Sequence, residues 1–315
     1  APRGSGGNTV SFLLGTILLA VVTALACALP GVFIVLRKNS MLVDAISHAI
    51  LPGIVVGYFF TRDLDSPLLI LGAALAGLVV VLGSEWLSRT GLLTGDAPQG
   101  LIFPALFSAG VILVTLNFAN VHLDVHAVLV GDLNLAAFQH LQFDGVSIGP
   151  GYLYVMLAVL AINTFFITAL YPHLKVMTFD AAFASAIGVR TRILGTTFMF
   201  LVSVTVTAAF HAVGAILVIA LVVAPAATAF LVTQRLRSMI VLTLVFAGGG
   251  ALAGFWIAYV LDAATSAGMA VLYGVLFIVV FVVSRARQRL GRGTRVSGQP
   301  ETADPAPIGA GRDPH

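Results

Sequence analysis

The stretch LRKNSMLVDAISHAILPGIVVGYFF, residues 36–60, decides the fold of this chain. It begins with two cations, Arg37 and Lys38, and continues as a hydrophobic segment. The segment is long enough to cross a bilayer, for which about 20 residues are needed. Asp44 and His48 lie inside it, although an ionisable side chain deep in a bilayer costs about 2.5–3.5 kcal/mol on insertion scales. The stretch therefore predicts a membrane-spanning helix in which Asp44 and His48 have a structural or functional role that offsets this cost.

Asp44 and His48 are four residues apart, which places both side chains on one face of an α-helix, one turn from each other. Pro52 follows four residues later, and because it has no N–H it leaves the carbonyl of His48 without its intrahelical donor. Carboxylate, imidazole and carbonyl oxygen could together hold a divalent cation. The pair could also be structural and hydrogen-bond to a neighbouring helix, so these residues alone leave both interpretations open.

The composition is that of a polytopic membrane protein. Of the residues, 59% are hydrophobic and 9% are charged, and the mean hydropathy is +1.05. These values lie well outside the range of soluble domains. The single cysteine, Cys27, lies in an apolar run, where packing is the expected role. The start of the sequence lacks the pattern of a cleaved signal peptide.

The fold class that we predict is all-α, with about eight to nine transmembrane helices. The expected spans cover residues 10–36, 41–60, 66–87, 99–118, 148–170, 193–210, 212–232, 239–261 and 268–284. We divide the chain into an external N-terminal segment (1–9), a transmembrane domain (10–290) and a disordered cytoplasmic tail (291–315) that is rich in Pro and Gly.

Cations alternate between the turns, and this sets the expected orientation. The turns after the odd-numbered spans contain Arg37, Lys38, Arg89, Lys175, Arg190, Arg192, Arg235, Arg237, Arg285, Arg287 and Arg289. The other side contains only Arg3 and Arg62. By the positive-inside rule the N-terminus is outside a cell membrane and the C-terminus is cytoplasmic. His48 then lies about 16 Å from the cytoplasmic edge, at 1.5 Å per residue, near the middle of the bilayer.

The stretch RKNSMLVDAISHAILPG resembles the second-helix signature of the membrane permeases of ATP-binding-cassette importers for manganese, zinc or iron. The matching residues are Asp44, Ala45, Ser47, His48, Pro52 and Gly53. The resemblance implies that Asp44 and His48 are ligands of a transported Mn²⁺, Zn²⁺ or Fe²⁺ ion. It does not indicate which of these metals is carried.

The segment YPHLKVMTFDAAFASAIGVRTR, residues 171–192, resembles the cytoplasmic segment of the same family. Thr178 is a candidate N-cap, and Gly188 a candidate end, of a short helix between them. The family resemblance implies a coupling helix at 178–189 that docks on the ATPase subunit, with Phe179, Asp180, Ala184 and Gly188 at the matching positions.

Residues 210–230 match the seventh-helix pattern of the family, in which Pro225 is expected to kink the span. His211 occupies a position where the family usually has Gln; we expect a solvated residue at the external end, with a gate-lining role as the alternative. The external segment 119–147 contains His122, Asp124 and His126, which would share one face of a strand. We favour an exposed turn there over a metal-collecting patch.

The chain has no Walker A pattern, so energy for transport must come from a partner. The resemblance implies a transport subunit that is not itself an enzyme and needs no bound cofactor. Its implied partners are a second, identical or similar permease chain, two cytoplasmic ATPase subunits, an extracytoplasmic metal-binding protein and the lipid bilayer, but no nucleic acid. The alternatives are a permease of a siderophore- or cobalamin-type importer and a proton-coupled secondary metal transporter. A large chelate would have no need of an Asp/His pair, and a secondary transporter no need of a coupling helix.

Overall fold

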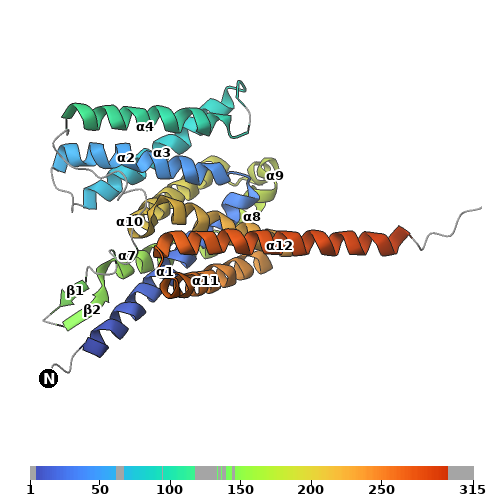
Figure 1. Cartoon of the computed structure of the whole chain (residues 1–315). Coiled ribbons are helices and arrows are strands. Elements are labelled where there is room, and N and C mark those ends of the chain that lie inside the picture. Colours follow the sequence, from blue (N-terminus) through green and yellow to red (C-terminus); the bar gives the residue numbers. More distant parts are fainter. Residues whose placement is uncertain are drawn as a thin grey trace, which may run out of the picture.

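The computed structural model describes residues 5–61, 67–93, 95–117, 133, 136, 140–143 and 146–296. The regular secondary structure of these residues is helical except for one two-stranded hairpin (Figure 1). The elements are α1 (Ser5–Leu36), α2 (Ser40–Thr61), α3 (Pro67–Arg89), α4 (Ala97–Asn117), β1 (His140–Phe143), β2 (Val146–Pro150), α7 (Gly151–Ala169), α8 (Tyr171–Phe179), α9 (Ala181–Ala186), α10 (Thr191–Val232), α11 (Leu236–Val260) and α12 (Thr265–Val296).

Eight of the described helices are long and apolar enough to cross a membrane, which confirms the predicted fold class. Seven of them match one predicted span each. The eighth, α10, has 42 residues and contains both of the predicted spans at 193–210 and 212–232. It is interrupted at Gly214, where φ is 79° and ψ is 168°. This backbone conformation is accessible essentially only to glycine.

Contacts along α10 show that the chain turns back at Gly214. Near its start, the Phe198 ring lies 5.9 Å from the ring of Phe33, close to the last turn of α1. Before the interruption, the Tyr152 hydroxyl at the opposite end of the bundle donates to the carbonyl of Ala208 (2.8 Å). Near the end of α10, Leu231 accepts a hydrogen bond from Ser284, beside the cations of α12. The two halves of α10 therefore run in opposite directions and account for two of the predicted spans.

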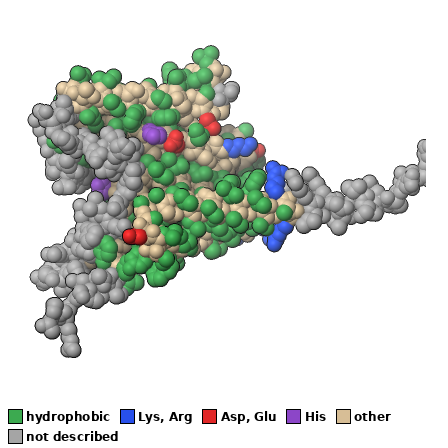
Figure 2. All heavy atoms as spheres, viewed as in Figure 1, with side chains coloured by type: hydrophobic (Ala, Val, Ile, Leu, Met, Phe, Trp, Pro, Cys, Tyr) green, Lys and Arg blue, Asp and Glu red, His purple; other side chains and the backbone are tan. Residues whose placement is uncertain are grey.

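With this reversal, the described Lys and Arg residues lie at one end of the bundle, where Figure 2 shows the blue side chains on the viewed face. They include Arg37 at the end of α1, Arg190 before α10, Arg237 at the start of α11 and Arg285 in α12. The apolar helices between the two ends expose Leu, Val, Ile and Phe side chains over their length. An apolar surface of this extent is unfavourable in water, and it is the surface expected of helices that contact the hydrocarbon core of a bilayer.

The helix α1 lies at the centre, packed against α7, α10 and α11. Its approach to α10 depends on Gly31, since a Cβ atom there would lie 2.0 Å from the carbonyl oxygen of Val222. The helices α2, α3 and α4 form a layer on the other side of α10 (Figure 1). Two helices are largely uncovered: only 6% of the spanning window of α4 and 17% of that of α12 is buried.

Some predicted boundaries were wrong. The fifth span begins at Gly151 and not at residue 148, because residues 146–150 form β2, which pairs antiparallel with β1. The helix α12 continues to Val296, past the predicted start of the tail at 291. Residues 285–290 are good helix formers, and the helix continues from them through Gly291 and Gly293. Residues 297–315 lie outside the described part of the chain.

Candidate metal site and coupling surface

Asp44 and His48 lie one above the other on α2, as their spacing predicted. The Nε2 atom of His48 is 3.4 Å from Oδ1 of Asp44, and about a third of each side chain is exposed (36% and 32%). Two ligand atoms that are each about 2.1 Å from a tetrahedrally coordinated ion are about 3.4 Å apart. The pair thus has the separation that binding of one ion requires, and its exposed part leaves room for further ligands.

The other residues of the second-helix signature have structural roles. Ser47 is buried, and its hydroxyl donates to the carbonyl of Val43 (2.9 Å) in the same helix. Gly53 allows α2 and α3 to touch, because a Cβ atom there would lie 2.5 Å from Cα of Ala73. Pro52 packs against Gly110 of α4 in the same way, since a Cβ atom on Gly110 would lie 2.7 Å from that of Pro52. The signature therefore fixes α2 between its neighbours and leaves Asp44 and His48 for the site.

Two phenylalanines of α4 surround the imidazole of His48, a contact that sequence analysis missed. The Phe103 ring is stacked on the His48 ring at 5.2 Å between centroids and an angle of 20°. The Phe107 ring meets it edge-on at 6.1 Å and 82°. Phe103 and Phe107 are themselves four residues apart on one face of α4, which was the only signal in the sequence. They restrict the orientation of the imidazole without competing for its nitrogens.

Within the described residues, no third His, Cys, Asp or Glu joins the pair. His211 is exposed on α10 near the Gly214 interruption, and its ring lies 5.1 Å from that of Tyr152, at the end of the bundle opposite the cations. His122, Asp124 and His126 lie outside the described residues. The described part of one chain thus offers two candidate ligands, fewer than the four that a tetrahedral ion takes.

The predicted coupling segment forms two helices, α8 and α9. The N-cap of α9 is Asp180, whose carboxylate accepts a hydrogen bond from the backbone N–H of Phe183 (2.8 Å). The prediction that Thr178 caps this helix was wrong: Thr178 lies inside α8 and its hydroxyl donates to the carbonyl of Leu174 (2.7 Å). Thr and Asp are both good N-caps, so local sequence could not decide between them.

Gly188 terminates α9, as predicted, one residue past the C-cap Ile187. Gly188 has a φ of 85°, and its N–H bonds to the carbonyl of Ser185 (3.1 Å) while that of Val189 bonds to the carbonyl of Ala184 (3.0 Å). This is the Schellman arrangement, in which glycine is favoured because the left-handed conformation has no Cβ penalty. Asp180 and Gly188 therefore define the two ends of α9.

The segment around α9 has one buried residue and three large apolar residues that are exposed. Ala184 is fully buried. Phe179 at the end of α8, and Phe183 and Ile187, four residues apart along α9 and its C-cap, are 60%, 55% and 55% exposed. We call these three exposed apolar side chains, at the cationic end of the molecule, the α9 ridge. Large exposed apolar side chains close together mark a surface that another protein or the membrane covers.

Arg37 connects the end of α1 to this segment. Its guanidinium donates two hydrogen bonds to the hydroxyl of Thr178 (3.3 Å each) and lies 4.9 Å from the centroid of the Phe198 ring. Burial lowers the pKa of Arg37 to about 10, which leaves it protonated at neutral pH. Arg37 thus ties α1, α8 and α10 together, only a few residues before Asp44 in the chain.

Comparison with known proteins agrees with this arrangement. The chain is 42% identical over 268 residues to the zinc transport system membrane protein TroD of Treponema pallidum, a match that covers 85% of this chain and 73% of that protein. It is 36% identical to the manganese transport system membrane protein MntD of Bacillus subtilis, over 88% of this chain and 94% of the relative. Among solved structures, PsaBC of Streptococcus pneumoniae in complex with a Fab superimposes with a TM-score of 0.70 at 26% identity, covering 86% of this chain and 91% of that one.

The family match extends over nearly all of the described bundle. The ABC 3 transport family matches residues 9–284, from the first turns of α1 to the last exposed apolar residues of α12. This range includes the Asp44–His48 pair, the α9 segment and both halves of α10. The chain therefore belongs to the ABC 3 transport family, as a membrane-spanning transport subunit.

Proposed function

We propose that this chain is the transmembrane subunit of an ATP-driven importer that moves a divalent transition metal ion into the cytoplasm. The observation that carries the proposal is the Asp44–His48 pair, two ionisable groups at ligand separation on a partly exposed face of a membrane-spanning helix. Ionisable groups inside a membrane-spanning helix cost free energy of insertion, and for that reason they commonly mark the pathway of a transported substrate or ion. Relatives named for zinc and for manganese transport support the same substrate class.

The ligand types suit Mn²⁺, Fe²⁺ and Zn²⁺. Carboxylate oxygen and imidazole nitrogen bind all three ions, whereas thiolate would favour zinc or copper(I). The only cysteine, Cys27, is buried in α1 and away from the pair. Selection among the three metals then depends on the ligands that complete the site.

We infer that a second permease chain, identical or similar, completes it. A two-fold axis beside α2 would bring two carboxylates and two imidazoles to one ion. The exposed surface of α4, which packs beside α2, is the apolar area that such a dimer would cover, since α4 is the least buried of the spanning helices described. Membrane helices associate through packing over such surfaces.

The two ends of the bundle have different proposed partners. The cationic end is cytoplasmic by the positive-inside rule, and there the α9 ridge offers an apolar surface to an ATPase subunit, one for each permease chain. Asp180 and Gly188 act in coupling by fixing the ends of α9, and Phe179 acts by direct contact. An extracytoplasmic binding protein would deliver the ion at the opposite end, near His211.

Uptake per folded molecule tests the proposal. Asp44→Ala and His48→Ala, assembled with the ATPase subunits in vesicles, should each abolish most uptake of Mn²⁺ or Zn²⁺, and the double variant should be scarcely worse than either. Such non-additivity is expected for two groups that bind one ion. His173→Ala, an exposed histidine of α8, is the matched control and should transport normally. Retained transport in both single variants would contradict the assigned site.

A further inference from the structure

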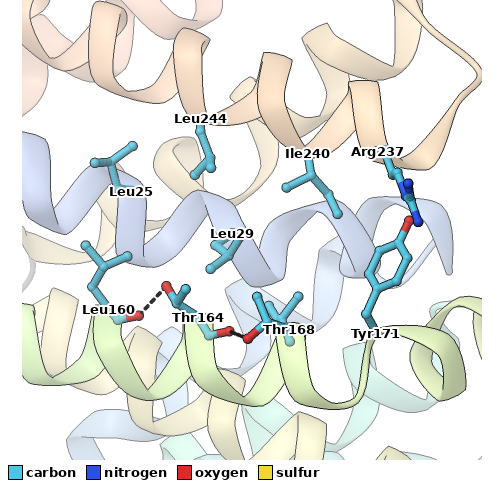
Figure 3. Close-up of a pocket in the computed structure, with 10 residues that line it drawn as sticks. Leu25, Leu29, Leu160, Thr164, Thr168, Tyr171, Arg237, Ile240 and Leu244 are labelled. Carbon is cyan, nitrogen blue, oxygen red and sulfur yellow. Dashed lines mark hydrogen bonds between the residues drawn. The ribbon is translucent and has the colours of Figure 1, made fainter.

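A groove runs along the bundle between α7 and α11, with α1 as its floor (Figure 3). Its volume is about 500 Å³, within the range of small-molecule sites. The lining residues are Leu25, Leu29, Leu160, Thr164, Ile167, Thr168, Tyr171, Arg237, Ile240 and Leu244. Both α7 and α11 pack against α1, and the space between them accommodates a long, narrow ligand.

The groove is apolar along its length. The two threonines that line it have their hydroxyls bonded within α7: Thr164 donates to the carbonyl of Leu160 (2.7 Å) and Thr168 to that of Thr164 (2.6 Å). Figure 3 shows both bonds as dashed lines beside the leucines of α1 and α11. Since both hydroxyls already donate hydrogen bonds within α7, a ligand in the groove needs no polar group to pair with them. A hydrocarbon chain therefore fits this part of the groove.

One end of the groove is different, because Arg237 and Tyr171 close it. The guanidinium carbon of Arg237 lies 5.9 Å from the centroid of the Tyr171 ring, and Figure 3 shows the two side chains reaching toward each other from α11 and from the start of α8. Arg237 is exposed and has no ion pair with any described carboxylate. A tyrosine and an arginine in this position are typical of the level of the lipid headgroups.

The length of the groove matches one leaflet. Leu160 on α7 and Tyr171 at the start of α8 mark its two ends, and eleven residues at 1.5 Å each span about 16 Å. Half of a hydrocarbon core of about 30 Å is about 15 Å. A lipid tail that enters from the headgroup level at Arg237 would therefore end near the middle of the bilayer.

We propose that this groove binds one anionic phospholipid of the leaflet on the cationic side, with an acyl chain between α7 and α11 and the headgroup phosphate on Arg237. Charge complementarity favours this occupant: the only charged group among the lining residues given above is Arg237, a cation at the cationic end of the bundle that pairs with no carboxylate among the described residues. A second copy of the chain fits less well. The groove lies on the far side of α1 and α10 from the layer of α2, α3 and α4 that carries the metal pair.

Native mass spectrometry of the purified full-length chain tests the proposal. The protein is washed in detergent, equilibrated with phosphatidylglycerol or phosphatidylcholine, and scored for retained lipid. The wild type should keep one phosphatidylglycerol per chain, in preference to phosphatidylcholine. Arg237→Gln should weaken this preference about fivefold, the equivalent of the ~1 kcal/mol expected for one cation near the membrane surface. Arg237→Lys should restore most of it.

Two further variants make the test specific. Arg285→Gln is the matched control, because Arg285 also lies over an aromatic ring (Phe281, 5.5 Å) at the cationic end but does not line the groove. It should retain phosphatidylglycerol as the wild type does. Thr164→Trp should fill the apolar part and reduce retention of both lipids. Equal retention in Arg237→Gln and Arg285→Gln overturns the proposal, as does loss of dimers in Thr164→Trp with lipid retention unchanged.

Discussion

The helices α1 and α4 are both strongly apolar, with hydropathies of 2.6 and 1.9 in their spanning windows, but their surroundings differ completely. Of the α1 window 72% is buried inside the chain, against 6% of the α4 window. In a membrane protein, therefore, hydropathy identifies a spanning helix and says little about which surface it meets. Packing geometry separates the two: α1 has glycine where α10 crosses it, and α4 has aromatic side chains where it meets His48.

The difference indicates a division of roles. The centre of the bundle fixes the architecture, while the groups that we propose to be functional lie on partly exposed surfaces. Asp44 and His48 are on α2 beside α4, and the α9 ridge is on the cationic end. We therefore expect substitutions at the centre to cost stability and substitutions on the exposed helices to cost binding or coupling.

Gly31→Ala tests the centre and has the largest expected effect. The new methyl group would lie 2.0 Å from the carbonyl oxygen of Val222, a main-chain atom that cannot move aside without shifting α10. We expect a loss of about 3 kcal/mol or more in stability, the upper range for overpacking. Gly100→Ala in α4 is the matched control, since nothing lies within 4 Å of its Cβ position. Thermal unfolding in detergent compares the two, and equal melting temperatures would contradict the contrast between α1 and α4.

Phe183→Ala tests the α9 ridge. More than half of this ring is exposed, so the variant should fold normally and weaken ATPase association by about 2 kcal/mol, as loss of an aromatic anchor does. Phe165→Ala, at an even more exposed phenylalanine of α7, removes a ring that we assign to the lipid-facing surface and should bind the ATPase normally. Pull-down of the ATPase by the full-length variants measures the effect. Equal binding by both would remove the coupling role from the ridge.

Phe103→Ala tests whether α4 serves the site. Loss of the stacked ring frees the imidazole of His48, and we expect metal affinity to fall by about 0.5–1.5 kcal/mol with little change in melting temperature. Leu101→Ala removes an exposed side chain from the same helix and should leave affinity unchanged. Isothermal titration with Mn²⁺ or Zn²⁺ separates the two variants, and a change in stability without a change in affinity would mean that Phe103 is structural.

Sequence reasoning succeeded where the determinants are local. The spanning segments follow from hydropathy over about 20 residues, and the 3.4 Å approach of His48 to Asp44 follows from helix periodicity. The end of α9 at Gly188 follows from the backbone freedom of glycine. Each of these depends on residues within a few turns of one another.

It failed where the determinants come from distant parts of the chain or where two local signals compete. The stacking of Phe103 on His48 joins two helices, and the two hydrogen bonds of Arg37 to Thr178 join residues 141 positions apart. The predicted cap was Thr178, but Asp180 caps α9 because Thr178 lies within α8. Two adjacent predicted spans implied that the chain reverses between them, but sequence analysis did not identify Gly214 as the residue where it does so.

The number of metal ions per chain tests the central claim most directly. We predict that the purified, metal-loaded permease, measured by inductively coupled plasma mass spectrometry together with its oligomeric mass, contains one Mn²⁺ or Zn²⁺ ion per two chains. His48→Ala should contain almost none at the same protein concentration and oligomeric mass. One ion in each monomeric chain, or an unchanged metal content in His48→Ala, would contradict a site in which Asp44 and His48 bind the transported ion and a second chain completes its coordination.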